Sequence, residues 1–107
     1  MDTKTERTPY VFHVEIDGNI VELSFCYVLD DESAIRRAAD DIRGDAQVHV
    51  HVRLEGRYVA EVATDRRGDV YALIVSSAEH GLVTNNRVTD DGIIVPIFDE
   101  FIQVFSN

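Results

Sequence analysis

The feature that most constrains this chain is a strict alternation of apolar and polar residues on both sides of a short turn. Before the turn, apolar and polar residues alternate over residues 10–16. After it, the apolar residues Val21, Leu23, Phe25 and Tyr27 alternate with Glu22, Ser24 and Cys26. Alternate residues of a strand share a face, so this period of two predicts half-buried strands. Asp17-Gly18-Asn19 supplies the positive-φ residues of a tight turn. Residues 10–29 are predicted to form a β-hairpin with the apolar sets on its buried side.

The period then changes from two to that of a helix. Apolar residues recur at the spacing i, i+3, i+4 and i+7: Ile35, Ala38, Ala39 and Ile42. This spacing predicts a helix over residues 31–43 with one apolar stripe. Asp30 or Asp31 can cap its first turn, and Gly44 ends it. The alanines in the stripe indicate close packing, most simply on the sheet.

Three further strands are predicted to follow as a meander. They cover residues 48–54, 57–64 and 70–76, with Glu55-Gly56 as a two-residue turn between the first two. The third is almost continuously apolar, so we expect it to be central or covered on both faces. A helical turn over 77–81 and a weak strand over 82–89 come next, followed by a turn at Asp90-Asp91-Gly92.

The C-terminal segment allows two interpretations. Pro96 followed by acidic residues favours a short helix over residues 96–105. Its apolar face would be core or a protein–protein surface. A strand over residues 93–98 is the alternative.

The predicted fold is a two-layer α+β domain in the order ββα-βββ-(β)-α. It has a mainly antiparallel sheet of 5–6 strands, one amphipathic helix packed on one face and a short C-terminal helix. Residues 1–8 are expected to form a flexible polar tail and residues 9–107 a single domain. Cys26 is the only cysteine, and no segment is apolar enough to span a bilayer, so a soluble cytoplasmic protein is expected.

Charge narrows the classes of partner. Acidic residues outnumber basic ones twenty to ten, and the net charge is −10. Direct binding to nucleic acid or to an anionic membrane surface needs clustered Lys and Arg. Both kinds of binding are therefore disfavoured for this chain. A basic protein surface, including that of a nuclease or a nucleic-acid-binding complex, is electrostatically favoured. Solubility or halophilic adaptation would also produce this balance.

The acidic residues gather around the predicted helix and the late turn. The candidate partner-binding residues are Asp30, Asp31, Glu32, Asp40, Asp41, Asp45, Asp90 and Asp91. Capping explains the first three, whereas acids near a helix C-terminus oppose its dipole. Pairs such as Arg36 with Asp40 and Arg37 with Asp41 can offset part of this cost. A solvated charged face is the competing interpretation.

A second candidate site lies on a strand. His49 and His51 would point to the same face and could share a metal ion, with Glu55 as a third ligand. Glu61 or Glu15 could replace Glu55, and an ordinary polar strand face is the alternative. Cys26 has no local group that would activate a thiolate.

No catalytic signature is present, so neither enzymatic activity nor a cofactor is expected. The sequence favours a small acidic, non-enzymatic binding or inhibitor protein that docks on a basic partner. One example is an immunity protein against a nuclease toxin. Another is a phage-type anti-defence inhibitor that acts as a nucleic-acid mimic. The alternatives are a metal- or small-ligand-binding domain using His49 and His51, and a homodimeric accessory domain.

Overall fold

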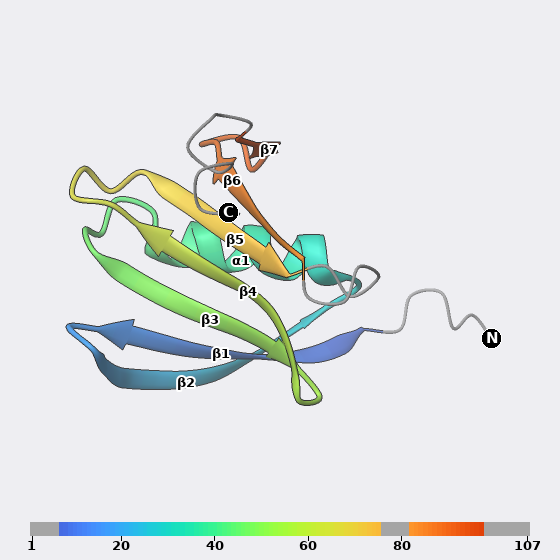
Figure 1. The fold of residues 1–107 in the computed structure, drawn as a ribbon. Coiled ribbons are helices and arrows are strands. Elements are labelled where there is room, and N and C mark those ends of the chain that lie inside the picture. The colour runs from blue at the N-terminus through green and yellow to red at the C-terminus, as the bar shows by residue number, and fades with distance from the viewer. Residues whose placement is uncertain (1–6, 76–81, 98–107) are drawn as a thin grey trace.

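The described part of the chain forms one curved antiparallel sheet with a single helix against its inner side. The computed structural model describes residues 7–75 and 82–97. The elements in chain order are β1 (Thr8–Ile16), β2 (Asn19–Val28), α1 (Asp31–Ile42), β3 (Val48–Leu54), β4 (Arg57–Thr64), β5 (Val70–Val75), β6 (Val83–Val88) and β7 (Ile94–Pro96). The seven strands follow the order β2-β1-β3-β4-β5-β6-β7, and every neighbouring pair is antiparallel (Figure 1). The α+β class and the single helix packed on a mainly antiparallel sheet are confirmed.

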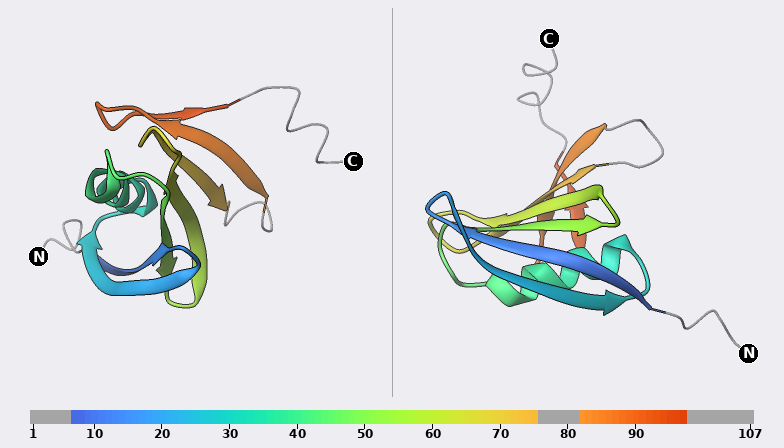
Figure 2. Two further views of the ribbon diagram at one scale, coloured as in Figure 1. Left: turned by 90° about the vertical axis from the view of Figure 1, so that its left-hand side faces the viewer. Right: turned by 90° about the horizontal axis from the view of Figure 1, so that it is seen from below.

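The sheet curls around α1, as Figure 2 shows from the side. Two register shifts contribute to this curvature, one between Val14 and Glu15 in the β1–β2 pair and one between Val52 and Arg53 in the β3–β4 pair. Such bulges bend a strand and increase its local twist. The helix therefore lies in a concave layer, and the convex outer face of the sheet has no described element over it.

The tight turn predicted at residues 17–19 and the two-residue turn predicted at Glu55-Gly56 are both found, except that Asn19 already belongs to β2. Asp17 and Gly18 have φ values of 53° and 80°, and they connect the paired residues Ile16 and Asn19. Glu55 and Gly56, with φ of 48° and 84°, connect β3 to β4 in the same way. Two successive residues with positive φ give a turn whose twist matches that of the flanking strands.

The helix begins and ends close to its predicted limits. Asp30 is the N-cap, and its side chain accepts a hydrogen bond of 2.8 Å from the backbone N–H of Ser33. The last helical residue is Ile42, and Gly44 follows with φ of 91°. The predicted apolar stripe is buried. With 12 residues, α1 is too short to cross a bilayer, and no other helix occurs in the described ranges.

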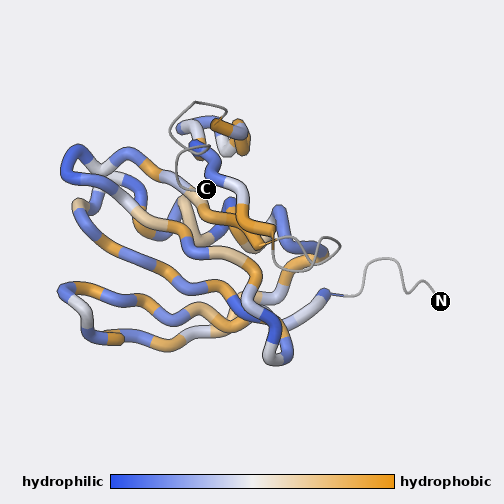
Figure 3. The backbone as a smooth tube through the Cα atoms, viewed as in Figure 1, coloured by the Kyte–Doolittle hydropathy of each residue, from blue (hydrophilic) through white to orange (hydrophobic). Residues whose placement is uncertain are grey.

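The core lies between α1 and the inner face of the sheet. Its largest fully buried side chains are Ile35, Val50, Val52, Val59 and Val62. Apolar and polar residues alternate along β1 and β3 in Figure 3, which fits strands with one buried face. Ala34, Ala38 and Ala39 of α1 are fully buried against the sheet, which agrees with the close packing predicted from the sequence.

The C-terminal part of the sheet differs from the prediction. There are seven strands instead of five or six, because residues 94–96 add β7 beside β6. Pro96 pairs with Asn86 in this strand and does not open a helix, so the strand alternative is the correct one over Ile94–Pro96. An edge strand tolerates proline because its missing N–H can face away from the ladder. The rest of the helix predicted over 96–105, from residue 98 onward, and the turn predicted over 77–81 lie outside the described residues.

The orientation of β2 reverses the prediction. Cys26 is buried beneath α1, whereas Leu23, Phe25 and Tyr27 are exposed on the outer face. The cause is the hairpin register, which places Cys26 opposite the buried Tyr10 and Phe25 opposite Val11. Because α1 covers the Tyr10 side of β1, the residues of β2 paired with that side are buried too. The more apolar side of β2 therefore faces outwards.

Candidate functional site

The helix side of the molecule carries the predicted acidic residues. Seven of the eight are exposed: Asp30, Glu32, Asp40, Asp41, Asp45, Asp90 and Asp91. We call these seven residues the acidic surface. The turn at 90–92 lies beside α1 because Arg36 Nε donates a 2.8 Å hydrogen bond to the carbonyl oxygen of Gly92. Residues about fifty positions apart in the sequence thus meet on one side of the fold.

Arginines hold part of this surface together without neutralising it. Arg43 pairs with Asp40 at 3.1 Å and with Asp90 at 3.4 Å, so it joins the end of α1 to the β6–β7 turn. The Asp90 side chain remains 95% exposed. The predicted Arg37–Asp41 pair forms at 3.8 Å, whereas Arg36 pairs with Glu32 at 3.2 Å and not with Asp40. Exposed pairs of this kind contribute little stability. The seven exposed acids outnumber these three arginines, so the surface keeps a net negative charge.

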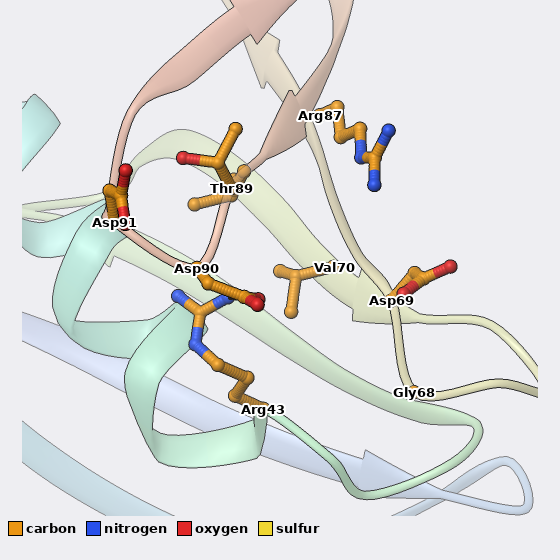
Figure 4. Close-up of a pocket in the computed structure, with 9 residues that line it drawn as sticks. Arg43, Gly68, Asp69, Val70, Arg87, Thr89, Asp90 and Asp91 are labelled. Atoms are coloured by element: carbon orange, nitrogen blue, oxygen red, sulfur yellow. Dashed lines mark hydrogen bonds and ion pairs between the residues drawn. The ribbon is translucent and has the colours of Figure 1, made fainter.

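A hollow of about 340 Å³ lies next to this junction (Figure 4). Its lining includes Arg43, Asp69, Arg87, Asp90 and Asp91. Asp69 and Arg87 are distant from the helix in sequence, and the β5–β6 pairing brings them beside Arg43, so local sequence patterns could not group them with the helix. In Figure 4 Arg43 and Arg87 lie on opposite sides of the hollow. A hollow lined by both acidic and basic side chains favours neither an anionic nor a cationic ligand.

Asp31 has a structural role. Tyr10 donates its hydroxyl to Asp31 at 2.6 Å, and Arg57 makes two hydrogen bonds of 3.1 Å to the two carboxylate oxygens. The Arg57 hydrogen bonds lower the pKa of Asp31, against a smaller opposing effect of burial. Burial, followed by the hydrogen bond to Asp31, raises the pKa of Tyr10. This network fixes the start of α1 to β1 and β4, and Asp31 is therefore engaged within the fold.

A second hollow, of about 450 Å³, separates the end of α1 from the β1–β2 hairpin. Asp41 and Asp45 border it together with Glu22 and Val21. Partial burial raises the pKa of Asp41, while the charge of Arg37 lowers it to a lesser extent. The acidic surface thus continues into a concave part of the molecule, next to apolar residues of the hairpin.

The histidines lie on the opposite, outer face of the sheet. His49 Nδ1 is 2.6 Å from a Glu61 carboxylate oxygen, and His51 Nε2 is 2.7 Å from one of Glu15. His51 Nδ1 also contacts the Tyr58 hydroxyl. Since a carboxylate only accepts, Nε2 of His51 donates to Glu15. Both ring nitrogens of His51 are therefore in use.

Glu55 lies away from this network, in the turn between β3 and β4. Across the described residues, no three His, Cys, Asp or Glu side chains are grouped so that they could hold a metal ion. A metal at His49 and His51 would also require His51 to lose one of its partners. The metal site therefore stays a prediction, and the glutamates that accompany the histidines are Glu15 and Glu61.

Cys26 is shielded from solvent. It is buried in the core under α1, and burial raises the pKa of its thiol. A nucleophilic cysteine needs the opposite, an exposed site where nearby positive charge lowers the pKa. Cys26 fits a core position.

An apolar stripe follows β2 on the outer face. Leu23, Phe25 and Tyr27 are 54–60% exposed, and Ile20 and Leu29 at the two ends of the strand are 55% and 52% exposed. We call these five residues the β2 stripe. Its alternation was visible in the sequence, but only the register with β1 decides that it faces solvent.

Comparisons of this chain with family models, with curated proteins and with solved structures gave no match.

Proposed function

We propose that this chain is a small acidic, non-enzymatic binding protein whose acidic surface docks on a basic surface of a partner protein. The observation that carries the proposal is the excess of exposed carboxylates on the helix side, where seven acids stand beside Arg36, Arg37 and Arg43, with Arg87 across the adjoining hollow. Clustered charge of one sign attracts a partner of opposite charge and orients it before contact. A nuclease toxin or another nucleic-acid-binding protein presents such a basic surface.

The position of the acidic surface supports this proposal. Its carboxylates come from both ends of α1 and from the β6–β7 turn, which Arg36 and Arg43 hold against the helix. A rigid element that presents charge loses little conformational entropy when a partner binds. The net charge of −10 adds a long-range attraction toward any basic protein.

Affinity capture with matched variants tests the proposal. The bait is the full chain, exposed to a lysate of the organism that encodes it, with bound proteins identified by quantitative mass spectrometry. The test variant combines Asp45→Asn with Asp91→Asn, and the control variant combines Asp17→Asn with Glu55→Gln in the two hairpin turns. Both variants remove two negative charges, so only the location of the charges differs.

We expect the wild-type chain and the control to enrich the same basic protein, and the test variant to retain roughly three- to tenfold less of it. Two exposed charge pairs of about 0.5 kcal/mol each give a change of this size. Equal loss with both variants would mean that only the overall charge matters. A captured protein that is itself acidic would refute the proposal.

A further inference from the structure

The β2 stripe lies on the outer face of the sheet, whereas the acidic surface lies on the helix side. Figure 2 shows these two sides of the fold. We propose that the β2 stripe is the interface with a second copy of this chain, with two hairpins packed face to face around a two-fold axis near Phe25. This inference does not depend on the proposed basic partner, because the two surfaces lie on opposite layers.

Charge favours a second copy over a basic protein at this position. None of the five stripe residues is charged, although the chain as a whole carries a net charge of −10. A basic partner would gain no electrostatic attraction here. Two copies repel each other through their acidic sides, but they can meet through the uncharged β2 stripe, which keeps those sides apart.

The size of the stripe is sufficient for a weak dimer. Each side chain leaves more than half of its surface exposed. With about 100 Å² for each aromatic residue and slightly less for each aliphatic one, the stripe offers roughly 500 Å² per copy. Two copies would bury about 1,000 Å², the lower limit for a specific interface. We therefore expect a dissociation constant in the micromolar range.

The symmetry of the stripe fits an isologous contact. Phe25 is its middle residue, with Leu23 and Tyr27 on either side. A two-fold axis at Phe25 places Leu23 of one copy against Tyr27 of the other, and the converse, so that every apolar residue finds an apolar partner. The two helices then face outwards, and the dimer presents two acidic surfaces in opposite directions.

Sedimentation equilibrium of the full chain over about 1–200 µM tests this inference. We expect the average mass to rise from the 12.1 kDa of one chain toward twice that value. Phe25→Glu should raise the dissociation constant at least tenfold. Ile93→Glu is the matched control, because Ile93 is similarly exposed, at 55%, but lies in the β6–β7 turn. It should leave the dimer unchanged.

Two further variants keep the result interpretable. Phe25→Thr retains a strand-forming residue, so it decides the matter if Phe25→Glu fails to fold. An equimolar mixture of Phe25→Glu and Phe25→Lys should restore dimers that neither variant forms alone, because opposite charges then meet at the axis. A wild-type chain that stays monomeric at 200 µM, or a dimer that survives Phe25→Glu and Phe25→Thr, would overturn the inference. A mixture that stays monomeric would contradict an axis at Phe25.

Discussion

Replacing Asp31 with alanine tests whether this acidic residue supports the fold. The Asp31→Ala variant removes both hydrogen bonds from Arg57 and the acceptor of the Tyr10 hydroxyl. Asp31 and Arg57 keep 39% and 35% of their side chains exposed, so solvent screens their pair and we assign it about 1 kcal/mol. Tyr10 is only 3% exposed, and its unpaired hydroxyl adds about 1 kcal/mol. The expected loss in the free energy of unfolding is about 2 kcal/mol.

Urea unfolding at pH 7 measures this loss, with Glu32→Ala as the control. Glu32 is the next residue of the same helical turn, but it pairs only with the exposed Arg36, so we expect less than about 0.5 kcal/mol. The pKa of Asp31 is lowered in the folded state, so its stabilisation is present above the ordinary carboxyl pKa of about 4 and is lost as the pH falls through the folded value. The difference between wild type and Asp31→Ala should therefore shrink below pH 4. Equal effects of the two substitutions at pH 7 would refute the reasoning.

Three other expectations follow from the described residues. Cys26 should react with a thiol reagent at pH 8 at least tenfold more slowly in the folded chain than in urea, because it is buried and its pKa is raised; equal rates would contradict its core position. Gly56→Ala should destabilise the fold by about 1 kcal/mol in thermal unfolding, since Gly56 has a φ of 84°, and an unchanged midpoint would argue against this turn. A metal site at His49 and His51 predicts stoichiometric divalent metal that is lost when both become alanine. Metal-free protein whose melting temperature does not respond to Zn²⁺ would exclude that site.

Local patterns in the sequence were sufficient for the hairpins and the helix. Asp17-Gly18 and Glu55-Gly56 fix their turns through positive φ, and the spacing from Ile35 to Ile42 defines the buried side of α1. Each of these signals depends on residues within one or two turns of chain. The same is true of Asp30, whose capping bond reaches only three residues along the sequence.

Features that depend on pairing between distant segments were not predictable in this way. The outward orientation of Phe25 depends on which side of β1 the helix covers, and both sides of that hairpin carry apolar residues. In the sequence, nothing distinguished Asp31 from its acidic neighbours. Its structural role depends on hydrogen bonds from Arg57, which lies 26 residues further along the chain. Arg43 and Asp90 meet across 47 residues, so their ion pair depends on how α1 and the β6–β7 turn come together in the folded chain.

The central claim is that the acidic surface attracts a basic partner, and the rate of association with the captured partner tests it most directly. Raising the ionic strength from about 0.1 M to about 1 M shortens the Debye length from about 10 Å to about 3 Å. Stopped-flow measurements should then show the association rate falling at least tenfold while the dissociation rate changes little. The Asp45→Asn, Asp91→Asn variant should show a weaker salt dependence than the Asp17→Asn, Glu55→Gln control. An association rate that does not respond to salt would contradict the claim.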